Sequence, residues 1–491
     1  MVERKNQSNL NDTNDLSYTM RKHITLLLLL ATAIALPATA SRGHNIQVQL
    51  NGFQNQELIL GYYFNKRMYV TDTVPISGTG LAVFQQEEAL PGGLYLFYLP
   101  NGKYFDVLIN DEQNFSIQTD TADLVGKMQI TGSKESSLFL DYQRFLMQKQ
   151  KESEALRNEI KANEGQQARV ADLSQQLQKV NQEVADYWDR AVQEHPETFF
   201  ASFIKAMRDP EIPDFELPAN TSNPDSLLQA KRYHYYKAHY FDNIDFQDER
   251  LLRTPFFVNK LEQYFERVLP QIPDTVSEAS IHLIEQSRGN EEMFRFLVQF
   301  LFNRANESKI MGMDAAMVAL AERYYLSGEA DWSTDEFLEQ LRTRVREIKP
   351  TLLGNTARDL QMESLDGPIY RLHEVQAPVT VLVFYEPSCG HCKTAIPKLY
   401  KEVFLPYRNK GVQVFAVYSM ADKEEWQGFV DQHGLHDWLN VYDPYHQTRF
   451  RAYYDIRSTP MIYVLDRDKK IAAKRLDVEQ LPGFIDHLLK Q

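Results

Sequence analysis

Residues 379–400 read VTVLVFYEPSCGHCKTAIPKLY, and this stretch decides the fold of the region around it. Val379–Tyr385 is a continuous apolar run, which is typical of a strand buried on both faces of a sheet. A helical pattern then runs from Gly390 to about Tyr407. The sequence therefore places Cys389-Gly390-His391-Cys392 where a strand gives way to a helix.

The two cysteines of this motif are the only two among the 491 residues of the chain. This count excludes a disulfide-stapled scaffold and any metal site with four cysteine ligands. Their close spacing suits a reversible Cys389–Cys392 disulfide across the first turn of a helix. Cys389 would lie at the helix N-terminus, where the macrodipole and free backbone N–H groups stabilise a thiolate. We therefore expect Cys389 to attack a disulfide and Cys392 to resolve the mixed disulfide.

Three other roles for the two cysteines compete with disulfide exchange. A static structural disulfide would close a very short loop and would remove little chain entropy. A metal site built on both cysteines and His391 lacks a clear fourth ligand, and His391 would point away from the pair. Peroxidase chemistry on one cysteine would not need the second. Dithiol–disulfide exchange is therefore the favoured chemistry, and it requires neither a metal nor a cofactor.

Short apolar runs and amphipathic stretches alternate through the rest of residues 351–491. Strands are expected at Val412–Tyr418, Leu439–Tyr442, Met461–Leu465 and Lys470–Lys474, and helices at Lys423–His433 and Val478–Lys490. Strands separated by helices imply a central sheet that is covered on both faces. We therefore expect a C-terminal α/β domain.

This order of elements, with Thr459-Pro460 before the last strands, resembles the thioredoxin fold. It is most similar to the exported TlpA/ResA-like thiol-disulfide oxidoreductases, whose lead-in to the first core strand matches Asp366-Gly367 and Leu372. The resemblance implies that Cys389 is the nucleophile and Cys392 the resolving thiol. It also implies that Pro460 is a cis-proline facing the disulfide and that Thr459 offers backbone hydrogen bonds to a substrate strand.

The sequence departs from the thioredoxin pattern at two places. Val383 occupies the position where thioredoxin has a buried aspartate that manages protons. Glu386 either replaces that aspartate or is a solvated loop carboxylate, and both interpretations stay open. Ser388 stands where thioredoxin has a tryptophan before the first cysteine, so substrate contact there is expected to differ.

His391 bears on the direction of the reaction. A cationic imidazole beside Cys389 favours the thiolate, hence the reduced form, and makes the pair more oxidising. Cys-Gly-His-Cys also resembles protein disulfide isomerase. The TlpA/ResA-like context instead implies reduction of protein disulfides, supplied by a membrane electron donor. We favour the reductase slightly, with oxidase and isomerase activity left open.

Two regions without readable chemistry precede this domain. Residues 41–132 predict a small antiparallel β domain, since residues such as Ile46, Val48 and Leu50 alternate with polar ones between turn signals. Residues 133–350 predict an α-helical middle domain. Both resemble the domains that precede thioredoxin modules in multidomain periplasmic proteins of Gram-negative bacteria, the helical one through Tyr240–Asp245 and Leu251–Pro255.

A heptad seam marks residues 166–195 within the helical region. The apolar positions are Val170, Leu173, Leu177, Val180, Val184, Tyr187 and Ala191. Such a seam could dimerise, but we favour an antiparallel hairpin with the preceding helix. The oligomeric state is not readable from the sequence.

The first forty residues predict export. A short basic segment from Met20, an apolar run from Ile24 to Leu36 and Ala38-Thr39-Ala40 together describe a signal peptide at residues 1–40. The apolar run is too short for the ~20 residues of a membrane span. Met20 is a candidate for the true start. We therefore expect a periplasmic or secreted protein, where disulfides persist.

The formal net charge of −14 argues against nucleic acid or anionic lipid as the main partner. The sequence thus predicts an exported thiol-disulfide oxidoreductase acting on protein thiols and disulfides. A second hypothesis is a periplasmic scaffold or binding protein, because most of the chain lies outside residues 351–491. A redox titration separates the two.

Overall fold

The computed structural model describes residues 43–218 and 222–490. The signal peptide expected at residues 1–40 lies outside the described residues. The chain divides into two compact units, one ending at Ile204 and the other beginning at Lys205. This boundary falls inside residues 133–350, the region expected as one helical domain, so those domain limits remain a proposal.

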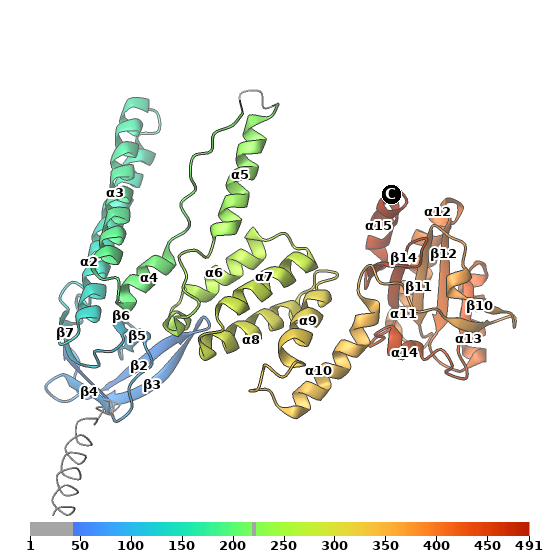
Figure 1. Cartoon of the computed structure of the whole chain (residues 1–491), viewed down its shortest axis with the longest axis horizontal. Coiled ribbons are helices and arrows are strands. Elements are labelled where there is room, and N and C mark those ends of the chain that lie inside the picture. Colours follow the sequence, from blue (N-terminus) through green and yellow to red (C-terminus); the bar gives the residue numbers. More distant parts are fainter. Residues whose placement is uncertain (1–42, 219–221, 491) are drawn as a thin grey trace, which may run out of the picture. The chain divides into compact units, whose positions relative to one another are not determined.

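Two four-stranded sheets build the start of the first unit (Figure 1). Their strand orders are β4-β1-β7-β8 and β3-β2-β5-β6. The strands are β1 (His44–Asn51), β2 (Glu57–Phe64), β3 (Arg67–Pro75), β4 (Leu81–Gln86), β5 (Gly93–Tyr98), β6 (Tyr104–Ile109), β7 (Asn114–Asp120) and β8 (Gln129–Thr131). Neighbouring strands pair antiparallel except β1 and β7, which are parallel. The expected small β domain is confirmed, with this one parallel pair as the difference.

The two sheets share one core. Ile46, Val48 and Leu50 on β1 are each at most 1% exposed and point into it, as their alternation with polar residues predicts. Phe84 on β4 meets Phe97 on β5 edge to face, with ring centroids 5.6 Å apart. Because β4 and β5 belong to different sheets, the two sheets pack face to face.

Helices α2 (Lys134–Ala162) and α3 (Gln167–Glu194) form an antiparallel hairpin, followed by α4 (Phe199–Met207). Phe145 stacks on Tyr187 with ring centroids 4.4 Å apart. The buried seam between the two long helices consists of Leu156, Leu173 and Val180. The heptad pattern therefore packs within the chain, as the hairpin interpretation predicted.

Helices also form the first part of the second unit. They are α5 (Pro224–His239), η1 (Glu249–Arg253), α6 (Phe257–Gln263), η2 (Tyr264–Val268), α7 (Pro273–Gln286), α8 (Glu291–Glu307), α9 (Asp314–Leu320), η3 (Ala321–Tyr325), α10 (Asp335–Ile348) and η4 (Lys349–Thr351). The expected helical character of this region is confirmed. Among the described residues, no helix is both long enough and apolar enough to span a membrane.

A seven-stranded sheet forms the C-terminal domain, with the order β10-β9-β13-β12-β11-β14-β15. Its strands are β9 (Gln361–Ser364), β10 (Ile369–Arg371), β11 (Val379–Tyr385), β12 (Val412–Tyr418), β13 (Leu439–Tyr442), β14 (Met461–Leu465) and β15 (Ile471–Lys474). The helical segments are η5 (Leu372–Glu374), α11 (Gly390–Leu399), η6 (Tyr400–Phe404), α12 (Leu405–Tyr407), η7 (Arg408–Lys410), α13 (Lys423–His433), η8 (Leu435–Asp437), α14 (Phe450–Tyr453), η9 (Val478–Gln480) and α15 (Leu481–Leu488). Strands β11, β12 and β13 are parallel, so their carboxyl ends share one edge of the sheet.

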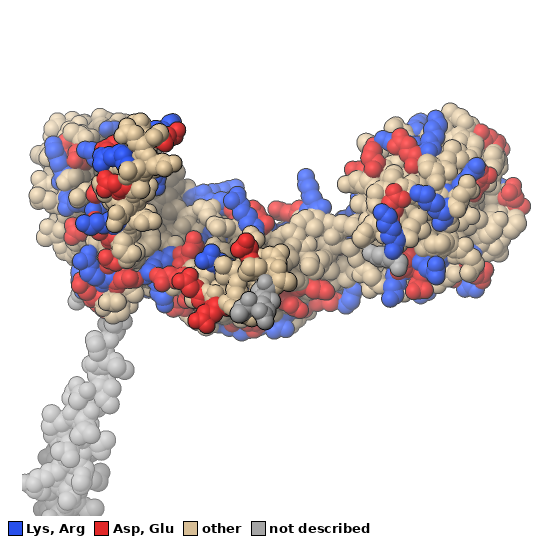
Figure 2. Space-filling model, turned by 90° about the horizontal axis from the view of Figure 1, so that it is seen from above, with Lys and Arg blue, Asp and Glu red and all other residues tan. Residues whose placement is uncertain are grey.

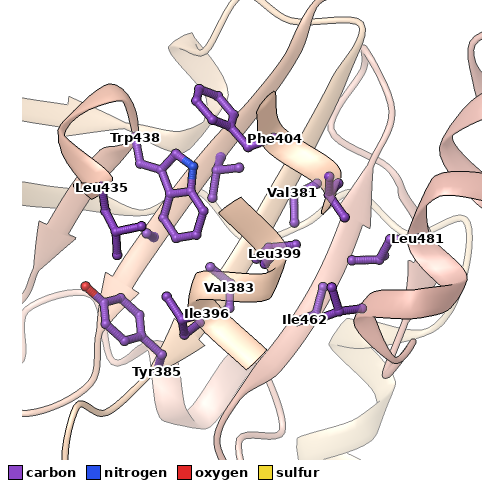
Figure 3. Packing of buried hydrophobic residues seen from close by; sticks show 14 of the residues in the cluster. Val381, Val383, Tyr385, Ile396, Leu399, Phe404, Leu435, Trp438, Ile462 and Leu481 are labelled. Atoms are coloured by element: carbon purple, nitrogen blue, oxygen red, sulfur yellow. The ribbon is translucent and has the colours of Figure 1, made fainter. Parts of the chain in front are cut away.

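The central strand β11 is buried on both faces, as its apolar run predicts. On one face, Val381 and Val383 pack beside Ile396 and Leu399 of α11 (Figure 3). Helices α13 and α15 add to the same cluster. On the other face, Phe384 stacks on a ring of α14 with centroids 5.6 Å apart. The expected sheet with two covered faces is therefore confirmed.

Acidic and basic side chains are intermingled on the molecular face drawn in Figure 2. No broad area of a single sign is visible on that face.

Candidate active site

The Cys389–Cys392 segment begins helix α11 directly after β11. Cys389 is the N-cap residue, and its backbone N–H donates to the Glu386 carbonyl at 3.1 Å. Cys392 lies one turn further on and is 0% exposed, whereas Cys389 is partly exposed. Both cysteines are free thiols in this structure. The strand–helix junction predicted for the motif is the one observed.

The two thiols have opposite electrostatics. The pKa of Cys389 is held below its ordinary value, chiefly by a hydrogen bond from the backbone N–H of Cys392 and next by one from the Thr459 side chain. Burial raises the pKa of Cys392 to about 11. A thiolate therefore forms first at Cys389, the sulfur that a substrate can reach.

Thr459 and Pro460 come to the redox thiols from a segment distant in sequence. The Cys389 thiol lies 3.2 Å from the Thr459 carbonyl oxygen, across 70 positions of the chain. The Thr459–Pro460 peptide bond is cis. Met461 follows and pairs with Phe384 of β11, so sheet register places the bond at the edge where β11 ends. The structure thus brings Cys389, Thr459 and Pro460 together.

Glu386 is paired with an arginine that sequence reasoning missed. A Glu386 carboxylate oxygen lies 3.5 Å from Nη2 of Arg451, and the same nitrogen donates to the Ser419 carbonyl at 2.9 Å. Arg451 therefore ties the loop before Cys389 to the loop after β12. No periodic pattern marks the segment around Arg451, and only the tertiary structure reveals it.

His391 and Ser388 are both exposed beside Cys389. Among the causes that lower the pKa of Cys389, His391 acts through its backbone N–H. This contribution requires no charge on the imidazole and persists at a pH where the ring is neutral. The roles of the imidazole and of Ser388 stay proposals.

Val383 is 0% exposed and has apolar neighbours, so its position supplies no proton-managing group. A polar group in the same cluster is the hydroxyl of Tyr385, which accepts a hydrogen bond from Trp426 Nε1 at 2.9 Å. Burial raises the pKa of Tyr385, and the negative charge of a Cys392 thiolate raises it further. Tyr385 and Trp426 are 41 positions apart, so no local pattern could have joined them.

Within the part of the chain that the structure describes, no group of three or more His, Cys, Asp or Glu side chains is placed to hold a metal ion.

At pH 7 we expect iodoacetamide to modify Cys389 in the native, reduced chain and to leave Cys392 unmodified. With a pKa of about 11, only about one Cys392 in ten thousand is a thiolate at that pH. The lowered pKa of Cys389 gives it a much larger reactive fraction. Peptide mass mapping measures both rates, with the urea-unfolded chain as the control in which both residues react. Equal rates in the native chain would contradict the assignment.

Residues 353–474 match the AhpC/TSA family. The C-terminal domain is a thioredoxin-like domain. Its strand order, the Cys389–Cys392 segment after β11 and the Thr459–Pro460 bond before β14 agree with that assignment. Upstream, residues 44–139 match DUF4369 and residues 165–332 match DUF5106, both described as domains of unknown function.

A curated protein is similar to part of this chain. The thiol-disulfide oxidoreductase ResA of Halalkalibacterium halodurans is 30% identical over 98 residues, which cover 19% of this chain and 55% of that protein. The chain thus spans about half the length of the curated relative it matches.

Solved structures similar to the chain come from several bacteria. A domain of a possible thiol-disulfide isomerase from Cytophaga hutchinsonii is 42% identical, with 28% of this chain and 94% of that chain covered and a TM-score of 0.27. A thioredoxin-like protein from Bacteroides caccae is 17% identical, with 57% and 99% covered and a TM-score of 0.42. A putative thiol:disulfide interchange protein DsbE from Chlorobium tepidum is 25% identical, with 28% and 97% covered and a TM-score of 0.26.

Proposed function

We propose that this chain is an exported thiol-disulfide oxidoreductase whose Cys389–Cys392 pair exchanges with the cysteines of protein substrates. The observation that supports this most is the asymmetry of the two thiols. Cys389 is accessible and has a lowered pKa, whereas Cys392 is buried and has a raised one. This division suits one sulfur that attacks and a second that resolves.

In the reducing direction, the Cys389 thiolate forms a bond to one sulfur of a substrate disulfide. The substrate S–S bond breaks, and its other sulfur leaves with the electron pair as a thiolate. Cys392 then gives its proton to solvent and attacks the sulfur of Cys389, which releases the first substrate sulfur. Two electrons have passed to the substrate, and the Cys389–Cys392 dithiol has become a disulfide.

A substrate segment would lie against Ser388, Thr459 and Pro460, which border the exposed side of Cys389. A second dithiol must then reduce the Cys389–Cys392 disulfide, and a membrane electron donor is the proposed source. The exported location rests on residues 20–40 of the sequence.

The direction of exchange depends on the reduction potential. The lowered pKa of Cys389 stabilises the dithiol form and moves the pair toward oxidising behaviour. The resemblance of the sequence to the TlpA/ResA-like proteins favours reduction. We propose the reductase direction.

A redox titration of the full chain in glutathione and dithiothreitol buffers tests this proposal. We expect one two-electron transition between about −120 and −300 mV, which is the range of exchange-active pairs. A disulfide that resists reduction below about −300 mV would instead support the scaffold hypothesis. A value near −270 mV supports the reductase direction, and one near −120 mV supports an oxidase.

A further inference from the structure

A cluster of charges outside the redox motif surrounds Asp455, whose side chain is only 2% exposed. Three guanidinium groups contact its carboxylate. They belong to Arg344 of α10, Arg475 after β15, and Arg457, whose Nε lies 3.3 Å away. A carboxylate this deeply buried is tolerated only when it is paired and hydrogen-bonded. The three arginines therefore hold the side chain of Asp455 in place.

Helix α10 supplies a second contact to the same segment. Arg457 Nη2 donates to the Glu347 carboxylate at 2.7 Å. Glu347 also lies 3.7 Å from the guanidinium of Arg344, one turn earlier on α10. Arg344 of α10 thus contacts Asp455, and Glu347 of the same helix contacts Arg457. Figure 1 shows α10 leading up to the C-terminal domain of the same unit.

The segment that begins at Asp455 leads to Thr459, which lies beside the Cys389 thiol. Asp455 and Arg457 stand four and two residues before Thr459, whose carbonyl is 3.2 Å from the Cys389 sulfur. Asp455 also has a positive φ of 39°, a left-handed conformation in which aspartate is enriched among non-glycine residues. The contacts that α10 makes with Asp455 and Arg457 therefore bear on where Thr459 lies relative to Cys389.

We propose that helix α10 positions the Thr459–Pro460 loop against Cys389, with Arg344 and Glu347 as positioning residues. The reactivity of the thioredoxin-like domain then depends on the helical region that precedes it, which has no other readable role at the site. This inference rests on the proposed function, because the loop matters only where Cys389 exchanges disulfides.

The variants Arg344→Ala and Glu347→Gln in the full chain test the coupling. The Thr459 side chain contributes to the lowered pKa of Cys389, so a displaced loop raises that pKa toward its ordinary value. We expect this rise to slow alkylation of Cys389 at pH 7 about threefold, because a smaller fraction of the thiol is then ionised. The contacts of Asp455 with Arg475 and Arg457 remain in both variants, so the loss is partial.

Arg346→Ala is the matched control. Arg346 lies on the same helix, is exposed, and donates to the Thr343 hydroxyl at 3.1 Å. We expect its Cys389 pKa and reduction potential to equal those of the wild type. A merely structural role would lower the melting temperature and leave both redox readouts unchanged, and that result would overturn the proposal.

If Arg344→Ala does not fold, Glu347→Gln decides the same question, because it removes one carboxylate charge and keeps the buried cluster. If the wild type shows no disulfide exchange, the proposed function fails. The alkylation profiles of Cys389 would still show whether α10 positions the loop.

Discussion

Replacing Cys389 with serine abolishes disulfide exchange, and we expect the rate of insulin reduction to fall by at least about 1,000-fold. The attacking group must be a thiolate, and a serine hydroxyl does not ionise near neutral pH. The rate is measured as the turbidity of precipitating insulin chains in the presence of dithiothreitol. Retention of activity by Cys389→Ser would remove the basis for the proposed enzyme.

The companion variant Cys392→Ser should accumulate mixed disulfides between Cys389 and substrate proteins. The buried resolving thiol is then missing, so the first exchange step has no successor within the chain. Non-reducing gels and mass spectrometry of the adducts measure the trapped species. Thr394→Ser, an exposed position on the same helix, is the control and should behave like the wild type.

Trp426→Ala should cost the thioredoxin-like domain about 3–5 kcal/mol of unfolding free energy. Trp426 is 0% exposed and stacks on Tyr418 with ring centroids 5.5 Å apart. Its indole N–H donates to the buried Tyr385 hydroxyl at 2.9 Å. Removing the ring therefore leaves both a large cavity and a polar group that has lost its partner.

Pulse labelling of buried Cys392 during a urea titration reports unfolding of this domain alone. We expect the midpoint for Trp426→Ala to fall by about 2 M urea. Trp426→Phe keeps a ring and loses the hydrogen bond, so it should cost only about 1–2 kcal/mol. Tyr445→Ala is the control, because Tyr445 is 76% exposed. Equal midpoints for Trp426→Ala and the wild type would refute this account of the core.

The sequence allowed the elements near the motif to be predicted because their signals are local. The apolar run Val379–Tyr385 predicts a buried strand, and the spacing of the two cysteines predicts a candidate exchange pair at the next helix start. The heptad positions predict the apolar face of α3, and the structure shows that this face packs against α2. The division of the chain between Ile204 and Lys205 carries no such signal, since it follows from which surfaces pack together.

Other features of the candidate site depend on residues far apart in the chain. Pro460 was assigned through a resemblance, because no local pattern distinguishes it from any other proline. The pairing of Glu386 with Arg451 and of Tyr385 with Trp426 could not be predicted, since each joins the end of β11 or the loop after it to a helix far along the chain.

The sequence by itself determined the α/β character of residues 351–491, the place of Cys389 and Cys392 at a strand–helix junction, and their candidacy for exchange chemistry. Those properties follow from spacing and composition over a few residues. Only the tertiary structure decided that Thr459 lies against Cys389 and that Arg344 meets Asp455 across 111 positions. Such contacts arise when separate elements pack around a common core. Which residues meet then depends on the packing geometry and not on how close they are in the sequence.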